Sequence, residues 1–574
     1  MALSSREADD EGASPYNGFT AMKNIPTSSA FPVTERTGCK SFVALTLCFL
    51  FVFAVAAAFR IPQISVRPVH GDEANQAVKT GILYDTGKYA YDPHEHHGPT
   101  LYYAALPVLY LCGVPSFEAS SIVHYRVVPL FFGLLLILLL WPMRKALGGW
   151  ATLWAALFLA ISHPFIFYSR YYVQEMLLVC FVQAVLAAGW WFIRRPTLPR
   201  AAVLGLCLGL VHATKETSIV IAFAMVGAIV LTVIYSRLRD KVPFKAAWDQ
   251  VASPRMSGLL LVTALVAIGI SVALFSSFFT HWRGPLDSIL TYTGYFSRAE
   301  GTGSSGVHDK PWYYYLSLLA YVYRQAGPRW TEGPALFAGL LGLIAVLVVR
   351  LPGKNGEDRE AAQSVLFRRF LLFYTLITVV VYSVIPYKTP WNLLVFYHGI
   401  LLIAGVGTAA LIHVARWRLL QAALVLVFLA GAAFMARQSY YGNYVYYADA
   451  RNPYVYAHPS KAVERIAERV NDIARISGEG SSMHINIIRP DGDYWPLPWY
   501  LRAYKRVGYW HRIPDNADAS VILVTPSLHE QLADHLHNQY MVEFQALRPG
   551  ILLNAYIRQD LWDAFIKTRS GTGG

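Results

Sequence analysis

Residues 41–59 read SFVALTLCFLFVFAVAAAF, nineteen residues without one charged side chain. A helix of this length is about 28 Å long and matches the hydrocarbon layer of a bilayer, which is about 30 Å thick. Apolar stretches of similar length recur along the chain as far as Met435 and then stop. The sequence therefore predicts a polytopic membrane domain, residues 41–436, followed by a soluble C-terminal domain, residues 437–574.

Eleven apolar stretches qualify as membrane-spanning helices, so the predicted fold class is a mostly α, polytopic helical bundle. The composition agrees, because only 15% of the residues are charged, against about 25% in soluble domains. The predicted spans are residues 41–59, 121–141, 150–167, 173–193, 201–217, 218–235, 257–279, 334–350, 370–386, 391–411 and 419–436.

Residues 98–114 are apolar enough to be a twelfth span, but they contain two prolines and several tyrosines, which prefer the membrane interface. If this stretch lies on the membrane surface, the segments on the same side of the membrane as the N-terminal tail hold 21 Lys and Arg residues. The loops on the other side, leaving out the first loop, hold 8. The positive-inside rule then makes the tail 1–40 cytoplasmic. The outer loops 60–120 and 280–333 and the domain 437–574 are extracytoplasmic, and the chain resides in the cytoplasmic (inner) membrane.

The net charge of +13 does not indicate nucleic-acid binding, because no run of five basic residues occurs and the Lys and Arg residues sit in short loops. Five cysteines include no CxxC pair, which argues against a zinc ribbon or a disulfide framework.

The C-terminal domain has an α/β pattern. Residues 461–476 have helical periodicity, 484–488 and 519–524 are typical of strands, and 527–537 is typical of a second helix. The aromatic patch DYWPLPWYLR, residues 493–502, is expected to dock this domain on the bilayer interface.

Ionisable residues gather in the loops of the predicted outer side. Because such residues are costly near a membrane, their convergence from several loops predicts one functional site between the helices at the outer boundary. The candidates are Asp72, Glu73, His94, Glu95, His97 and Tyr102 in the first loop, Arg170 and Glu175 in the next turn, Lys215, Arg298 and Lys388.

Three motifs resemble those of the GT-C glycosyltransferases. They are Asp72-Glu73 after the first span, the HGPxxYY string at 97–103 and Arg170-Tyr-x-x-x-Glu175. The similarity covers residues 41–440 and extends to protein O-mannosyltransferases, the aminoarabinose transferase of lipid A and Rgt-type galacturonosyltransferases. Within these, GDEANQAVKTGILYDTGKYAYDPHEHHGPTLYYAALP resembles the flippase-activity-associated glycosylation proteins. Some relatives have Asp where this chain has Glu175.

The resemblance implies a polyprenyl-phosphate sugar donor, whose lipid stays in the bilayer while its sugar lies at headgroup level. Transfer requires a base for the acceptor hydroxyl and charge stabilisation of the departing phosphate. Asp72 is the preferred base and gives inversion at the anomeric carbon. Glu73 or Glu175 orients the acceptor or holds a divalent cation such as Mg or Mn, whose ligands are carboxylate oxygens. No cofactor is otherwise implied.

Four cations are candidates for the donor phosphate: Arg170, Lys215, Arg298 and Lys388. Side chains of the first loop are candidates for contact with the rest of the substrates, namely His94, Glu95, His97 and Tyr102. The predicted partners are the lipid-linked donor, a glycan, lipid or protein acceptor, and the membrane lipids.

Structural explanations stand beside these roles. Asp72 and Glu73 suit the first turn of a helix, where acids favour the dipole, and Glu175 could form a structural pair with Arg170. The HEHH run at 94–97 has zinc-ligand types, but a solvated turn or substrate contact fits adjacent histidines better. The alternative functions are a lipid-linked sugar flippase and a non-catalytic accessory protein of glycan assembly.

Overall fold

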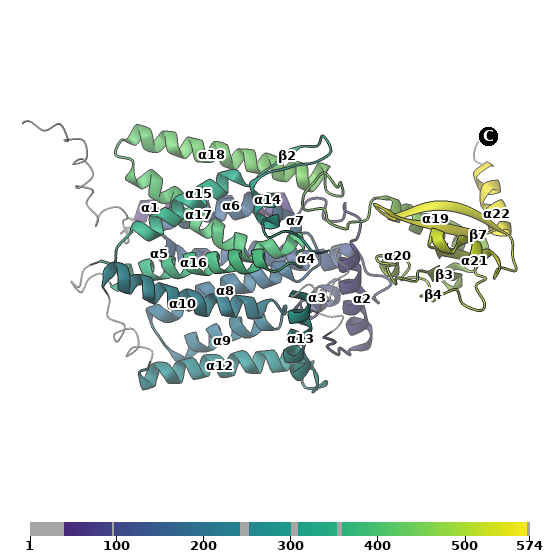
Figure 1. The fold of residues 1–574 in the computed structure, drawn as a ribbon, viewed down its shortest axis with the longest axis horizontal. Coiled ribbons are helices and arrows are strands. Elements are labelled where there is room, and N and C mark those ends of the chain that lie inside the picture. Colours follow the sequence, from purple (N-terminus) through teal and green to yellow (C-terminus); the bar gives the residue numbers. More distant parts are fainter. Residues whose placement is uncertain (1–38, 94–96, 242–251, 300–307, 353–358, 571–574) are drawn as a thin grey trace, which may run out of the picture.

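The computed structural model describes residues 39–93, 97–241, 252–299, 308–352 and 359–570. Eight helices within these ranges are long and apolar enough to cross a membrane, which confirms the predicted polytopic, mostly α bundle (Figure 1). They include α1 (Cys39–Arg60), α4 (Ile122–Leu138), α8 (Glu175–Arg194), α10 (Ser218–Asp240), α12 (Pro254–Phe275), α16 (Arg359–Val384), α17 (Leu394–Val414) and α18 (Arg418–Tyr440).

Three shorter apolar helices occupy the remaining predicted spans: α6 (Gly149–Ile161), α9 (Leu198–His212) and α15 (Gly333–Val348). Each packs along longer helices, α6 against α17 and α1, α9 against α12 and α8, and α15 against α17. The predicted span 150–167 is broken after Ile161, because Pro164 opens the separate short helix α7 (His163–Tyr168).

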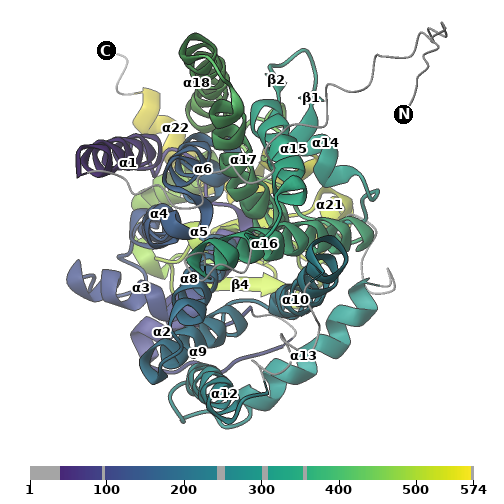
Figure 2. The same cartoon turned by 90° about the vertical axis from the view of Figure 1, so that its left-hand side faces the viewer.

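Helices α2 (Gly71–Thr86), α3 (Thr100–Leu111) and α13 (Gly284–Ala299) lie across one end of the bundle rather than along it (Figures 1 and 2). We call this end, which also carries the C-terminal domain, the domain end, and the other the opposite end. The apolar stretch 98–114 thus forms a helix at the bundle end. The remaining short elements are α5 (Arg144–Leu147), α14 (Tyr314–Ala320), β1 (Val322–Tyr323) and β2 (Arg329–Trp330).

Glycines allow the central helices to approach closely. A Cβ added to Gly342 of α15 would lie 2.0 Å from the carbonyl oxygen of Ile403, and one added to Gly407 of α17 would lie 2.2 Å from that of Ala338. Small residues at helix interfaces are the usual means by which membrane helices pack closely. The pair α15 and α17 therefore depends on these two glycines.

The C-terminal domain is a five-stranded sheet in the order β4-β3-β5-β7-β6. Strand β3 is parallel to β4 and β5, while β7 is antiparallel to β5 and β6. Helices α19 and α22 contact β6, and their apolar residues share one core with the sheet. The elements are α19 (Ala462–Ser477), β3 (His484–Ile488), α20 (Leu497–Tyr500), β4 (Arg506–Trp510), β5 (Val521–Val524), α21 (His529–Ala533), β6 (Tyr540–Arg548), β7 (Ile551–Arg558) and α22 (Gln559–Ser570).

The predicted helix 461–476 and strand 484–488 lie where expected, whereas the predicted helix 527–537 contains only the short α21. The aromatic patch 493–502 was predicted to rest on the bilayer. Within the patch, Trp499 packs against the rings of Phe117 and Tyr125, and Trp495 and Tyr500 join the same apolar cluster. Leu497 and Leu501 of the patch belong instead to the core of the C-terminal domain. The aromatic side chains of the patch therefore bind the C-terminal domain to the membrane domain.

Candidate functional site

The site is built around the N-terminus of α2. His70 precedes this helix, and its Nδ1 accepts a hydrogen bond from the Asp72 amide at 3.0 Å, while the Glu73 carboxylate accepts one from the His70 amide at 3.2 Å. This reciprocal capping box fixes the first turn. The Asp72 side chain is exposed, and its carboxylate has no hydrogen bond or ion pair with any residue that the structure describes. The backbone of Asp72 is therefore fixed by the cap, while its carboxylate is exposed.

The neighbouring acid, Glu73, has a different environment. It is fully buried, both of its oxygens accept hydrogen bonds from Arg126 of α4 at 2.8 Å, and the Tyr172 amide donates to Oε1 at 3.0 Å. Burial alone would raise the pKa of Glu73, but the charge and hydrogen bonds of Arg126 lower it to about 2. The bonds from Arg126 and Tyr172 hold α2 on α4 and on the 168–175 turn, and the remaining bond, from the His70 amide, belongs to the cap.

Glu175 and Lys215 form a buried ion pair between the start of α8 and the turn before α10. Lys215 Nζ also donates to the Asn392 side chain at 3.2 Å. The structure therefore joins two of the predicted site residues, but it pairs Glu175 with Lys215 and not with Arg170. Asn392 was not predicted, and it follows Trp391 in the turn between α16 and α17.

A cluster of rings surrounds His70, the residue that caps the Asp72 helix. The centroid of the His70 ring lies 5.3 Å from that of Tyr171, 6.0 Å from that of Trp391 and 5.6 Å from that of His458. Tyr456 extends the cluster at 5.9 Å from Trp391. This group is not predicted from the sequence, because its members lie far apart along the chain. The only available signal was the mixture of His and Trp with the tyrosines.

His308 contacts the ring cluster through Tyr456. Its Nδ1 is 2.8 Å from the Tyr456 hydroxyl, and its ring centroid lies 4.9 Å from that of Tyr387. Burial lowers the pKa of His308, while the Asp72 carboxylate acts in the opposite direction, so the two groups lie within electrostatic range.

Lys388 lies in the same region, because its amide donates to the His308 carbonyl at 3.0 Å. Its buried ammonium group donates to the carbonyl oxygens of Lys310, at 3.3 Å, and of Ile385. Burial lowers the pKa of Lys388, and Asp309 partly offsets this. The predicted cation is thus held at the site by backbone oxygens, and no ion pair joins it to a described residue.

The guanidinium group of Arg170 is committed to the backbone. It donates to the carbonyl oxygens of Pro62 at 2.8 Å and Gln63 at 2.7 Å, and it stacks on the ring of Tyr444. It thereby ties the segment after α1 to the segment after α18. These contacts give Arg170 a structural role. They do not support its predicted contact with the donor phosphate.

The remaining predicted residues of the first loop are dispersed. His97 Nδ1 lies 2.8 Å from the buried carboxylate of Glu216, and the Tyr102 hydroxyl donates to Gln76 of α2. Both side chains join the first loop and α2 to their neighbours. The predicted residues His94 and Glu95 lie outside the described residues. For Arg298 of α13, the backbone is described but the side chain is not.

The acids predicted to bind a cation, Glu73 and Glu175, do not fit a shared metal site. Each is paired with its own basic side chain, and within the described ranges no three His, Cys, Asp or Glu side chains are grouped as metal ligands. A divalent cation needs several oxygen ligands with uncompensated charge. Glu73 and Glu175 therefore do not form a shared cation site in the parts of the chain that the structure describes.

The C-terminal domain contributes to the surroundings of Asp72. A Cβ added to Gly71 would lie 3.3 Å from Trp495 Cβ, so the backbone at the start of α2 is in close contact with the domain. Arg548 of β6 is paired with Asp493. Burial and Arg489 lower the pKa of Arg548, whereas Asp491 and Asp72 oppose this shift, which places a guanidinium group within electrostatic range of the Asp72 carboxylate.

Comparisons with known proteins identify the fold. ArnT from Cupriavidus metallidurans, bound to undecaprenyl phosphate, is similar over 91% of this chain and 99% of its own, with a TM-score of 0.58 and 14% identity. The Archaeoglobus fulgidus oligosaccharyltransferase tethered with an acceptor peptide is similar over 91% of this chain and 76% of its own, with a TM-score of 0.52 and 12% identity. The chain therefore has the GT-C fold, and the predicted resemblance is confirmed.

Within this class, the family model of dolichyl-phosphate-mannose-protein mannosyltransferases matches residues 48–282. This range begins in α1 and ends just beyond α12, and it contains Asp72, Glu175 and Lys215. A comparison with curated protein sequences gives no significant match.

Proposed function

We propose that this chain is a membrane glycosyltransferase that moves a sugar from a polyprenyl-phosphate donor to an acceptor hydroxyl outside the cytoplasmic membrane. The observation that carries the proposal is the environment of Asp72. In a fold shared with lipid-phosphate-binding glycosyltransferases, it is an exposed carboxylate without a described partner, held at the N-terminus of a capped helix.

Asp72 is the general base. Its carboxylate takes the proton of the acceptor hydroxyl while that oxygen attacks the anomeric carbon of the donor sugar. The bond from the anomeric carbon to the phosphate oxygen breaks, and polyprenyl phosphate leaves with the electron pair. Attack from the side opposite the phosphate inverts the anomeric centre. The leaving phosphate is stable as an anion, so the site needs no general acid.

The departing phosphate needs positive charge. Lys388 is the best supported candidate, because its backbone amide is bonded to His308 and the described partners of its ammonium group are neutral carbonyl oxygens. Lys215 is a weaker candidate, since Glu175 already neutralises it. Arg298 remains a candidate from the sequence.

The half-buried ring of Tyr456 offers a surface for the substrate, and the buried rings of Trp391 and Tyr171 continue the cluster inward. Together with His70 they form a cluster with centroid distances of 5.3 to 6.2 Å. Aromatic faces bind apolar C–H faces while hydroxyl and ring N–H groups bind polar atoms, so such a cluster suits a sugar ring. We propose that it positions the donor sugar beside Asp72.

The domain end is proposed to face away from the cytoplasm. The segments predicted to share the side of the N-terminal tail carry 21 Lys and Arg residues, and the opposite loops after the first carry 8. This bias follows the positive-inside rule. A donor carried by a polyprenyl lipid would then present its sugar at the outer headgroup level, close to α2.

The proposal is tested with the purified full-length protein in bilayer vesicles and a panel of polyprenyl-phosphate sugars, with nucleotide sugars as the matched control donors. We expect release of polyprenyl phosphate and a glycosylated acceptor for at least one lipid-linked sugar, and none for nucleotide sugars. Movement of an unchanged lipid-linked sugar between leaflets without transfer would instead identify a flippase. Neither transfer nor movement with any donor would favour an accessory protein.

A further inference from the structure

The opposite end of the bundle carries a large groove that the proposed reaction does not use. Its volume is about 1400 Å³, and it lies among α1, α6, α17 and α18. Pockets for drug-sized ligands are about 300–1,000 Å³, so this groove suits a larger molecule. Its walls are mainly aliphatic and aromatic, with Phe51, Leu157, Val425 and Leu429 among the lining residues.

Cations gather along the same groove, and among its described lining residues only one acid, Glu360, accompanies them. Lys145 shares that acid with Arg194, at 3.5 Å and 3.0 Å. Arg144 has no ion pair with a described residue; its guanidinium group stacks over Trp141 at 5.0 Å from the ring centroid and donates to the Trp141 carbonyl. The groove is therefore apolar along its walls and positive at one end.

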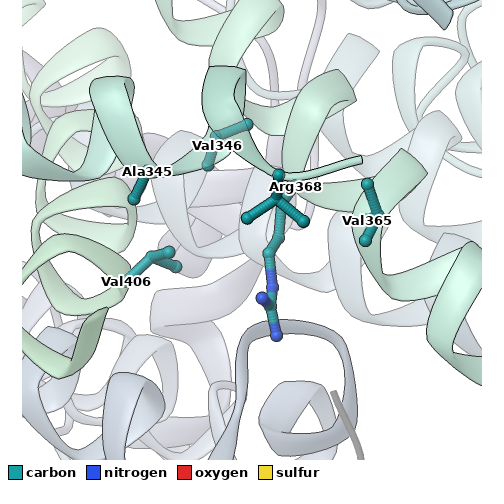
Figure 3. Close-up of a pocket in the computed structure, with 6 residues that line it drawn as sticks. Ala345, Val346, Val365, Arg368 and Val406 are labelled. Atoms are coloured by element: carbon teal, nitrogen blue, oxygen red, sulfur yellow. The ribbon is translucent and has the colours of Figure 1, made fainter. Parts of the chain in front are cut away.

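Arg368 of α16 adds a third cation from within the bundle. Its aliphatic part borders a small cavity of about 10 Å³, and its guanidinium group points away from Ala345, Val346 and Val406 (Figure 3). Its Nε donates to the Ala146 carbonyl at 2.9 Å, and the side chain also lines the large groove. Although Arg368 is only 6% exposed, no described acid pairs with it. A buried guanidinium group inside a membrane domain is costly unless it serves a ligand or partner.

We propose that this groove binds a phospholipid with an anionic headgroup. The headgroup phosphate is held by Arg144, Lys145 and Arg368, and the acyl chains lie on the apolar walls between α1 and α18. Two guanidinium groups and one ammonium group match a phosphodiester in charge and in hydrogen-bond donors. Basic pockets between membrane helices bind anionic lipids in this manner.

The occupant is expected to be a membrane phospholipid and not the polyprenyl-phosphate substrate. The cations of the groove lie on α5 and α16 at the opposite end of the bundle, whereas Asp72 lies on α2 at the domain end (Figure 1). A lipid in the groove would therefore support the packing of α1 and α18. These helices are poorly buried: 22% of the apolar segment of α1 and 17% of that of α18 lie inside the structure.

The test is native mass spectrometry of the full-length protein in detergent, titrated separately with phosphatidylglycerol, phosphatidylcholine and polyprenyl phosphate. The main variant is Arg144→Gln/Lys145→Gln, whose positions are not buried. Arg416→Gln/Arg418→Gln is the matched control, because it removes the same charge from exposed positions at the same end outside the groove. Arg368→Gln and Arg368→Lys separate loss of charge from loss of packing.

We expect the wild-type protein to retain phosphatidylglycerol in preference to phosphatidylcholine. Two lost cations should weaken this binding by about 10- to 30-fold, and the control pair should leave it unchanged. Arg368→Lys should retain more of the lipid than Arg368→Gln. Equal binding of both phospholipids, an equal loss in the control pair, or preferential binding of polyprenyl phosphate would each overturn the proposal. The assay needs no sugar transfer, so its result is independent of the proposed function.

Discussion

Asp72 and Glu73 are neighbours in sequence, yet their side chains have opposite environments. Successive residues of a helix are about 100° apart, so once the first turn is capped by His70 one acid faces Arg126 and the other faces outward. The sequence made Asp72 the preferred base and assigned Glu73 a supporting role in the chemistry. It did not show that Glu73 is buried against Arg126, since the direction of each side chain depends on the packing of α2 on α4. The His70-x-x-Glu73 spacing is the local signal of a capping box, and it could have assigned Glu73 a structural place.

The first prediction concerns that pair. Glu73→Gln leaves Arg126 as a buried, unpaired charge, which should cost about 3–5 kcal/mol of stability and lower the Tm in detergent. Asp85→Asn, on the same helix but exposed, is the control and should change the Tm little, because the amide oxygen can still accept from the Phe117 amide.

The difference between wild type and Glu73→Gln should depend on pH. The folded-state pKa of Glu73 is lowered to about 2, so its stabilisation is present above the unfolded value of about 4.3 and is lost as the pH falls toward 2. When the Tm values of the wild-type protein and of Glu73→Gln are measured from pH 7 to pH 3, they should approach each other only below about pH 4. A constant difference across this range would contradict the assignment.

At the scale of elements, helix periodicity and length were sufficient to place the bundle. Each of the eleven predicted spans overlaps a helix, because a run of apolar residues long enough to cross a bilayer has few other stable forms. Eight of these helices are long enough to cross a membrane, three are shorter, and the predicted span 150–167 is broken after Ile161. The same reasoning missed the cluster of His70, Trp391 and Tyr456, since its members come from three segments whose proximity is set only by tertiary packing. It also missed the paired strands β6 and β7, because apolar and polar residues alternate only weakly along them.

The second prediction concerns the crossing of α15 and α17. Gly407→Val would place a Cβ 2.2 Å from the Ala338 carbonyl oxygen, where only a glycine fits. We expect a loss of about 1–3 kcal/mol or more of stability, measured as a lower Tm and as aggregation in detergent. Gly269→Val in α12 is the control, because a Cβ there meets nothing within 4 Å. Equal effects of the two substitutions would contradict the close-packed crossing.

At the scale of the molecule, the C-terminal domain is docked against the start of α2 through its aromatic patch (Figure 1). The Val69 amide donates to the Tyr500 hydroxyl at 3.0 Å, and Arg502 donates to the Ser120 carbonyl at 2.6 Å. The sequence signalled this patch by its unusual density of aromatic residues. It could not indicate the binding surface, because a bilayer interface and a protein surface both select Trp and Tyr.

The third prediction concerns this docking. Tyr500→Phe leaves the buried Val69 amide without its acceptor, which should cost about 1–3 kcal/mol and loosen the segment before Asp72. Hydrogen exchange of residues 66–73 should become faster, and sugar transfer should fall. Tyr504→Phe is the matched control, since its hydroxyl bonds within the C-terminal domain to Asn471. Unchanged exchange in Tyr500→Phe would show that the domain does not hold this segment.

The fourth prediction concerns orientation. In a protein whose native cysteines are replaced by serine, a cysteine at Ser482 should react with a membrane-impermeant reagent in intact cells. A cysteine at Arg416 should react only after the membrane is opened. Both positions are exposed and lie on opposite ends of the bundle. Labelling in the reverse order would place the proposed site in the cytoplasm.

The most direct test of the central claim is the turnover of Asp72→Asn with the lipid-linked donor that the wild-type protein uses, with Asp85→Asn as its matched control. Loss of a general base lowers turnover by about 10²–10⁴-fold, and we predict a loss of this size for Asp72→Asn with unchanged Tm and unchanged turnover of the control. Turnover of Asp72→Asn equal to that of wild type would contradict the account.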